Sequence, residues 1–311
     1  MRLPVLLLLI GHLVLAGIVA PRLVGASTWA QRRPTWGLAA AHAAAGATVV
    51  GWLALGALAA HDGVERVMME LLHVDKTLLH DAYAGDGAVD PAWTLASLLV
   101  VALVGALTMS AARSTMRVRR ERAHYRQRAC APSSSGDLQV VTGVEPPSIW
   151  CIPGPRGGTI FATASAVELL TAAELRGAVG HERAHLRRRH HLMVLAADVV
   201  TSILGPVGFL RRYPEIVRFL VELDADDVTA RTCTRRVLAF ALYRLGSASV
   251  APGTLGANDT ATDRRIRRLL DRHGSQSTTA PLHAGLAILV LFATPVAAVA
   301  GPALALAGTA H

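Results

Sequence analysis

Long apolar stretches alternate with polar segments along the chain. Four of these stretches are long enough to cross about 30 Å of hydrocarbon, which takes roughly 20 helical residues. They are residues 3–20, 36–60, 91–112 and 282–310. The polar block 113–281 is long enough to fold as one domain with its own core. The pattern predicts an α-helical multi-pass membrane protein, with three transmembrane helices in 1–112, a soluble domain in 113–281 and a fourth transmembrane helix in 282–311.

The charged residues beside these stretches predict their orientation. Seven arginines and one acidic residue lie in 113–128, directly after the third stretch, whereas the loop 61–90 contains seven acidic and two basic residues. Positively charged flanks stay on the cytoplasmic side of a membrane. We therefore expect a plasma-membrane protein with its N-terminus and its acidic loop outside, and with the domain 113–281 in the cytoplasm.

The first apolar stretch has a second interpretation. Arg2, the leucine-rich centre and the small residues near Ala20 are also typical of a secretory signal peptide, so removal of residues 1–20 stays open. Three arginines in the segment after this stretch outnumber the single Arg2 before it. Their excess favours a retained span with its N-terminus outside.

Composition supports a membrane protein and weakens other classes. The chain is 52% hydrophobic and 17% charged, with a mean hydropathy of +0.40, which is too apolar for a soluble protein of 311 residues. Its net charge of +9 would suit a nucleic-acid partner. However, the arginines lie beside predicted spans and no DNA-binding motif accompanies them, so we expect contact with the lipid bilayer and no direct nucleic-acid binding. Three cysteines without C-x-x-C spacing predict reduced thiols (Cys130, Cys151 and Cys233).

Short apolar segments separated by turn-forming residues follow the basic stretch. After an expected linker at 132–136, three segments are rich in β-branched residues and bounded by proline and glycine, at 138–142, 148–152 and 159–163. These segments predict a small antiparallel sheet.

Helical patterns follow the predicted sheet. The sequence Thr-Ala-Ala-Glu at 171–174 is a capping box, so a helix should begin at Ala172. Further helices are predicted at 214–230, which begins with proline, and at 237–245. The apolar segment 192–210 contains an aspartate, a glycine and a proline, which favours a buried hairpin or a segment lying against the membrane.

The first of these helices carries a chemically specific motif, His181-Glu182-Arg183-Ala184-His185. Two histidines four residues apart share a helix face, so both imidazoles can bind one zinc ion while Glu182 reaches its water. His190 and His191 lie farther along, and their spacing indicates ordinary helix residues. Alternatively, His181 and His185 are solvated helix residues. This alternative is less favoured, because acidic residues suitable as a third metal ligand follow in the sequence.

A hydrolytic zinc site needs a third protein ligand and one open position for water. Glu222 lies on the second predicted helix, followed one turn later by Asp226. The spacing of four puts both on one face, so Glu222 can bind the metal and Asp226 can orient a histidine. The alternative is a solvated acidic face, since two further aspartates lie beside them.

Several segments occur together in a characteristic order: Trp150-Cys151-Ile152-Pro153-Gly154, the run from Glu174 to His185, the Glu222 to Asp226 pattern, and Arg265-Ile266-Arg267-Arg268-Leu269. In this order, and with the predicted spans, the chain resembles the integral-membrane zinc peptidases of the BlaR/MecR antirepressor family, which are related to HtpX-type membrane proteases. The resemblance covers nearly the whole chain.

The resemblance implies a cytoplasmic α+β gluzincin-like peptidase domain with one Zn²⁺ per chain. It implies that His181, His185 and Glu222 are the metal ligands and that Glu182 is the general base. An extended substrate could pair with the strand at 159–163, because such strands lie beside zinc helices.

Function follows from the resemblance as an expectation. The chain would be an endopeptidase that cleaves cytoplasmic proteins, with a BlaI-type transcriptional repressor as a possible substrate. An HtpX-like quality-control protease and a non-catalytic signalling or scaffold protein are the alternatives. The sequence contains no Ser-x-x-Lys motif outside the predicted spans, so we expect it to differ from the best-known relatives in having no penicillin-binding sensor domain. A signal would therefore act through loop 61–90, the spans or a separate sensor partner. Whether the chain forms a homodimer stays open.

Overall fold

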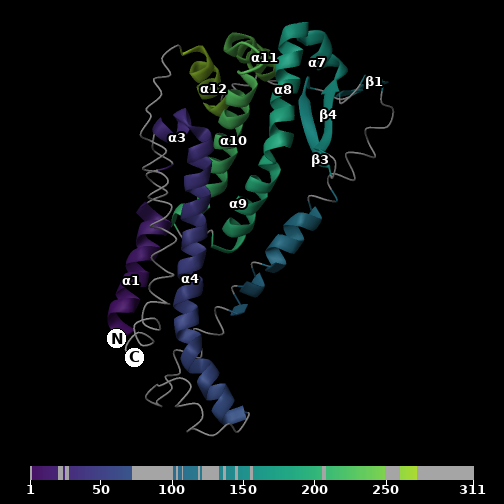
Figure 1. Cartoon of the computed structure of the whole chain (residues 1–311). Helices are drawn as coiled ribbons and strands as arrows, with labels where there is room; N and C mark the ends of the chain where they lie inside the picture. Colours follow the sequence, from purple (N-terminus) through teal and green to yellow (C-terminus); the bar gives the residue numbers. More distant parts are fainter. Residues whose placement is uncertain are drawn as a thin grey trace, which may run out of the picture.

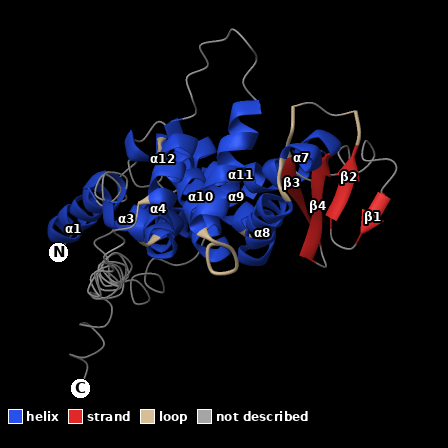
Figure 2. Ribbon diagram, turned by 90° about the horizontal axis from the view of Figure 1, so that it is seen from above, coloured by secondary structure: helices blue, strands red, loops and turns tan. Residues whose placement is uncertain are grey.

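The protein is mostly helical, with a small sheet at one end (Figures 1 and 2). The computed structural model describes residues 2–19, 24, 28–71, 101–102, 104–106, 108–117, 120, 133–135, 138–143, 146–154, 157–204, 208–248 and 260–271. The described part therefore combines a predominantly helical body with a mixed sheet, as the α+β prediction requires.

The N-terminal region forms a helical pair. Helix α1, Arg2–Val14, continues into the π-helix η1, Leu15–Val19, and both lie beside the long helix α4, Pro34–Leu71 (Figure 1). The short helix α3, Thr28–Arg32, precedes α4 and packs closely on its first turn. A Cβ atom at Gly37 would lie 2.9 Å from the carbonyl oxygen of Ala30, so glycine permits this close approach.

Among the described residues, one helix is long and apolar enough to cross a membrane. It is the segment Pro34–Leu55 of α4, with a mean hydropathy of 1.6 and half of its most apolar window buried against the protein. This segment overlaps the second predicted span. Leu7–Ile18 is a shorter apolar helix within the first predicted span. The spans at 91–112 and 282–310 lie partly or wholly outside the described residues, and the multi-pass topology stays a prediction.

Four strands form the sheet, in the order β1-β2-β4-β3. They are β1, Ser133–Ser135; β2, Leu138–Val141; β3, Ile149–Gly154; and β4, Gly157–Thr163. β3 and β4 form an antiparallel hairpin, and Gly157 and Gly158, the first two residues of β4, have φ of 113° and 125°, a region that favours glycine. The three predicted strand segments are confirmed.

The prediction of a wholly antiparallel sheet was wrong. β2 pairs in parallel with β4, from Leu138 opposite Ile160 to Val141 opposite Thr163. The cause is that β3 does not pair with β2, its neighbour in sequence, but lies on the far side of β4. The segment 132–136 was also expected to be a linker, whereas Ser133–Ser135 forms the strand β1, antiparallel to β2.

Helices in the second half of the chain position the candidate chemistry. After α7, Ala164–Leu169, come α8, Ala172–Arg188; α9, His190–Leu204; the 3-10 helix η2, Gly208–Arg211; α10, Tyr213–Thr229; α11, Arg235–Ala248; and α12, Thr260–Leu270. The predicted start of α8 is confirmed, because Thr171 and Glu174 form both hydrogen bonds of the capping box. The helices predicted at 214–230 and 237–245 correspond to α10 and α11.

Two boundaries differ from the sequence expectation. The apolar segment 192–210 was expected to be a buried hairpin or a segment lying against the membrane, whereas residues 192–204 belong to the continuous helix α9 and Gly208 to Leu210 belong to η2. The acidic loop was expected to begin at residue 61, whereas α4 continues to Leu71. The rest of this loop, 72–90, lies outside the described residues.

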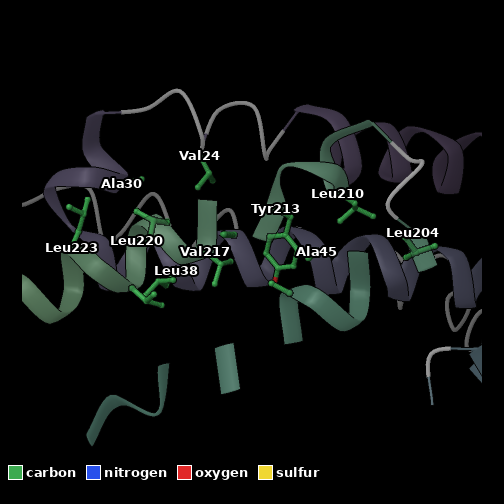
Figure 3. Close-up of a cluster of buried hydrophobic side chains, with 13 residues drawn as sticks. Val24, Ala30, Leu38, Ala45, Leu204, Leu210, Tyr213, Val217, Leu220 and Leu223 are labelled. Atoms are coloured by element: carbon green, nitrogen blue, oxygen red, sulfur yellow. The ribbon is translucent and has the colours of Figure 1, made fainter. Parts of the chain in front are cut away.

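The largest buried apolar cluster joins the N-terminal helices to the helices of the second half. Ala30, Leu38 and Ala45 from α3 and α4 pack with Val217, Leu220 and Leu223 from α10, and with residues of α9 and η2 (Figure 3). α4 therefore contributes to the core that supports α10.

Candidate metal centre

Helix α8 presents the two histidines of the motif on one face. The capping box starts the helix at Ala172, and the helical repeat then places His181 and His185 one turn apart. Their Nε2 atoms are 3.0 Å apart. His181 is buried, with 6% of its surface exposed, and His185 is half-buried.

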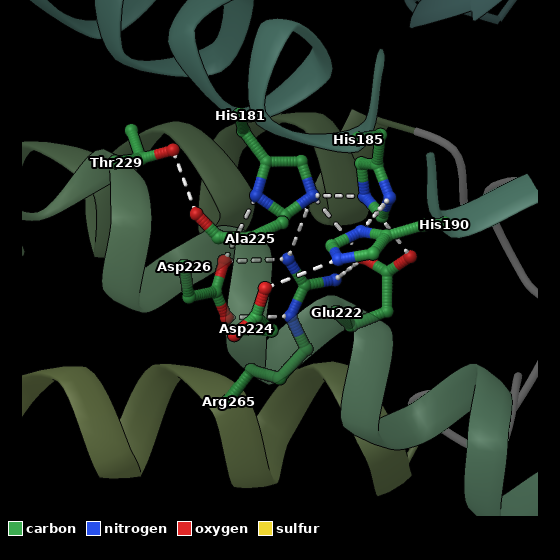
Figure 4. A network of polar contacts seen from close by, with 9 residues as sticks. All are labelled: His181, His185, His190, Glu222, Asp224, Ala225, Asp226, Thr229 and Arg265. Carbon is green, nitrogen blue, oxygen red and sulfur yellow. Dashed lines mark hydrogen bonds and ion pairs between the residues drawn. The ribbon is translucent and has the colours of Figure 1, made fainter. Parts of the chain in front are cut away.

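Helix α10 brings Glu222 to the same point (Figure 4). Its Oε2 atom lies 3.2 Å from Nε2 of His181, and its Oε1 atom lies 3.4 Å from Nε2 of His185. One ligand atom from each residue falls within 4.8 Å of the others. Two imidazole nitrogens and one carboxylate oxygen at this separation fit a catalytic zinc ion, which takes three protein ligands and keeps a fourth position open.

Asp226 and Arg265 lie behind these residues. Oδ1 of Asp226 lies 3.1 Å from Nδ1 of His181, the ring nitrogen that points away from Glu222. Arg265 of α12 donates to both carboxylate oxygens of Asp226, at 2.9 and 2.8 Å, and its Nη1 lies 2.8 Å from Oε2 of Glu222. The sequence analysis noted Arg265 as part of a basic motif but gave it no contact with the centre.

Charge and burial set the protonation of the side chains that form the centre. Burial would lower the pKa of His181, but the hydrogen bonds with Asp226 and Glu222 raise it to about 9. Burial raises the pKa of Glu222, but His181, His185 and Arg265 outweigh it and hold this pKa well below the ordinary value. Despite its burial, the pKa of Asp226 is also lowered, by His181 and Arg265.

Glu182, which follows His181 on α8, lies near Cys151 of the sheet. Its carboxylate and the thiol of Cys151 on β3 are close enough to share a hydrogen bond. Burial, the charge of Glu182 and that hydrogen bond raise the pKa of Cys151 far above that of an exposed thiol, so Cys151 stays protonated. Cys151 is therefore a neutral neighbour of Glu182.

His190 and Asp224 are parts of the centre that the sequence analysis missed. His190 is 2% exposed; its Nδ1 lies 2.9 Å from Nδ1 of His185, and its Nε2 lies 3.1 Å from Oδ2 of Asp224. On a continuous helix, a residue five positions after His185 would point elsewhere. Here α8 ends, Arg189 adopts a left-handed φ of 54°, and His190 begins α9 facing back toward His185. The roles predicted for His181, Glu182, His185, Glu222 and Asp226 stay predictions, although the structure brings these residues together.

Comparison with known proteins supports a metalloprotease. Residues 150–216 match peptidase family M48, a family of zinc metalloproteases. A stretch of 74 residues is 31% identical to the protein named protease HtpX homolog of Aquifex aeolicus (strain VF5) and covers 24% of each chain. The match thus spans about a quarter of the length of this curated relative. No solved structure gave a significant match.

These matches show that part of the chain is similar to M48 metalloproteases: residues 150–216 to the family, and a 74-residue stretch to a protein named as an HtpX homolog. The M48 match includes the β3–β4 hairpin and the histidine motif of α8 but ends before Glu222. The third ligand therefore rests on the geometry of the centre. The closer relationship to BlaR/MecR antirepressors stays a prediction.

Proposed function

We propose that this chain is a membrane-bound zinc endopeptidase that hydrolyses peptide bonds of cytoplasmic proteins. The observation that carries the proposal is the convergence of His181, His185 and Glu222 from two helices within 4.8 Å, beside Glu182. The match to peptidase family M48 over 150–216 supports it independently. The basic stretch 113–128 supports a domain that faces the cytoplasm.

The chemistry assigns one task to each group. His181, His185 and Glu222 would hold the zinc ion, which would supply a Lewis acid that lowers the pKa of a bound water and polarises the scissile carbonyl. Glu182 accepts a proton from the attacking water and returns it to the leaving amine nitrogen. Asp226 holds the ring of His181 in place through Nδ1, and Arg265 holds Asp226.

The free edge of β3 is the best place for an extended substrate. The sequence analysis favoured the strand at 159–163, but both edges of β4 are occupied by β2 and β3. No described strand pairs with the outer edge of β3. At the start of the hairpin, the N–H of Thr163 donates to the main-chain oxygen of Ser148, and the N–H of Ser148 donates to Oγ1 of Thr163, so the main-chain groups of Ser148 face β4. In an antiparallel pair, successive residues turn these groups alternately toward and away from the neighbouring strand. The main-chain groups of Ile149 and Cys151 therefore point outward. A substrate segment that added to this edge would lie beside Glu182.

Two substrate classes are proposed. A BlaI-type repressor follows from the resemblance to antirepressor peptidases. Damaged membrane proteins, as for an HtpX-like quality-control protease, are supported by the similarity to the Aquifex protein named as an HtpX homolog. A non-catalytic scaffold has less support, because a structural zinc site closes its fourth position with another cysteine or histidine. Among the described residues, the metal-binding group contains neither Cys151 nor Cys233.

The test combines zinc stoichiometry with proteolysis of co-expressed substrates. We expect about one zinc per chain in the wild type and in Glu182→Gln, with cleavage lost in Glu182→Gln, and loss of both in Glu222→Ala. Glu215→Gln, an exposed position on the same helix α10, should retain both. Equal cleavage in all variants, or no zinc in the wild type, would contradict the proposal.

The same strains distinguish the two substrate classes. Accumulation of an uncleaved repressor in the Glu182→Gln strain supports the antirepressor role. Accumulation of misfolded membrane proteins without a change in repressor supports the quality-control role.

A further inference from the structure

A line of hydrogen bonds connects the candidate membrane helix α4 to the metal centre. Oγ1 of Thr35, in the first turn of α4, donates to Oδ1 of Asp224 at 2.6 Å. The other carboxylate oxygen of Asp224 lies 3.1 Å from Nε2 of His190, and Nδ1 of His190 lies 2.9 Å from Nδ1 of His185. Figure 4 shows the inner part of this line, from Asp224 through His190 to His185.

The inner members of the line are shielded from solvent. Asp224 and His190 are 3% and 2% exposed, whereas Thr35 lies at the surface. A buried carboxylate must have its hydrogen bonds satisfied. Besides Thr35 and His190, the described partner of Asp224 is the half-exposed Arg188, whose Nε is 3.5 Å away. Asp224 is therefore held mainly by one residue of α4 and one of α9.

The chemistry of the line sets the direction of each hydrogen bond. An ionised carboxylate only accepts, so His190 must carry a proton on Nε2, which faces Asp224. In a neutral imidazole, Nδ1 of His190 is then an acceptor, and Nδ1 of His185 must donate to it. His185 is thereby left with a free lone pair on Nε2, the atom that faces His181 and Glu222.

We propose that His190, Asp224 and Thr35 are positioning residues for the zinc ligand His185, so that helix α4 forms part of the metal centre. The proposal rests on the proposed function, since it takes His185 as a ligand. Partners that fix the tautomer and ring orientation of a metal-binding histidine raise metal affinity, and their loss costs about 10- to 100-fold.

A second contact keeps α3 and α4 in register with α10. Arg268 of α12 donates to both carboxylate oxygens of Asp227, at 2.9 and 2.7 Å, and to the main-chain oxygen of Gln31 at 3.0 Å. Asp227 lies three residues after Asp224 on α10. Arg268 therefore links α10 to α3, and Thr35 meets Asp224 where α4 and α10 also share the core of Leu38 and Leu220.

The test measures zinc affinity of the full chain by competition with a chelator, together with the visible spectrum of the cobalt-loaded protein. We expect His190→Phe, which keeps a ring but removes both nitrogens, to weaken zinc binding by at least about tenfold and to alter the cobalt bands. Thr35→Val should weaken binding by about threefold, and Thr35→Ser should restore it, because serine keeps the hydroxyl.

Matched variants serve as controls. Thr48→Val removes a hydroxyl of the same helix whose hydrogen bond, among the described residues, is to the main-chain oxygen of Ala44, and His191→Ala changes the neighbour of His190. Both should bind zinc as the wild type does. Because the members act in one line, Thr35→Val should add nothing in the His190→Phe background.

The outcomes separate this proposal from the proposed function. If the wild type binds no zinc, or if His185→Ala binds zinc as tightly as the wild type, the proposed function fails. If zinc binding depends on His185 but is unchanged in His190→Phe, or equal in Thr35→Val and Thr48→Val, the positioning line is overturned and the peptidase proposal stands.

Discussion

The side chain of Arg265 compensates two carboxylates within the metal centre. Asp226 is completely buried, and its oxygens receive two hydrogen bonds from Arg265. Arg265→Met removes the arginine that compensates this buried charge and leaves His181 as its neighbour, so we expect a loss of about 3 kcal/mol in the free energy of unfolding. Thermal unfolding in detergent would measure it.

The matched control is Arg267→Met on the same helix. Arg267 forms an exposed ion pair with Asp263, four residues earlier, and such pairs contribute less than about 1 kcal/mol. If both variants lost a similar free energy of unfolding, the buried charge of Asp226 would not explain the contribution of Arg265 to stability.

At this scale, local spacing predicts part of the centre and tertiary packing sets the rest. The histidine motif could be predicted because His181 and His185 lie one turn apart on a single helix. His190 could not be predicted in this way. Its approach to His185 depends on the break between α8 and α9, and its link to Asp224 depends on a contact between two helices that are distant in sequence. The basic motif at 265–269 gave a signal for Arg265 but not for its partners.

The break between α8 and α9 makes a prediction at the scale of the element. Arg189 adopts a left-handed conformation, which costs a residue with a Cβ atom about 1–2 kcal/mol and costs glycine little. We expect Arg189→Gly to raise the unfolding temperature and to keep zinc affinity. Arg189→Val, with a β-branched side chain, should lower both, because His190 follows directly.

Thermal unfolding and zinc competition on the two variants check this prediction. Arg187→Val, at an exposed position inside the regular part of α8, is the control for the loss of an arginine. Equal behaviour of Arg189→Gly and Arg189→Val would contradict the role of the left-handed residue.

Elements with a local signal were predicted well from the sequence. The capping box at 171–174 fixes the start of α8 through contacts within one turn. The sheet order has no comparable signal, because alternation identifies strands without identifying their partners. For the same reason the pairing of β2 with β4, and the occupied edges of β4, appeared only in the structure.

At the scale of the whole molecule, α4 predicts a topology that labelling can test. Its first turn contacts Asp224 near the metal centre, and Leu71 lies at its other end. With a cytoplasmic metal centre, a cysteine at Thr28→Cys should be protected in intact cells. One at Glu65→Cys, on the last third of α4, should react with an impermeant thiol reagent.

The experiment uses a variant whose three cysteines are replaced by alanine. Permeabilised cells provide the control, since both positions should then react. Labelling of Thr28→Cys in intact cells, with Glu65→Cys protected, would invert the proposed orientation.

Apolar length in the sequence predicted that α4 could span a membrane, but not that half of its most apolar window is covered by protein. The packing of Leu38 and Ala45 against α10 depends on side chains about 170 residues away. Hydropathy measures the apolar length of α4 but contains no information about which residues pack against it.

The core shared by α4 and α10 has a consequence for how such a protein can evolve. Val217, Leu220 and Leu223 would become solvent-exposed if the chain were cut after its N-terminal helices. The helices that form the candidate metal centre and the candidate membrane helix α4 are therefore not interchangeable modules. Recombination that exchanged α4 for an unrelated anchor would have to preserve the face that fits α10, so the anchor and the helix bearing Glu222 are expected to be inherited together.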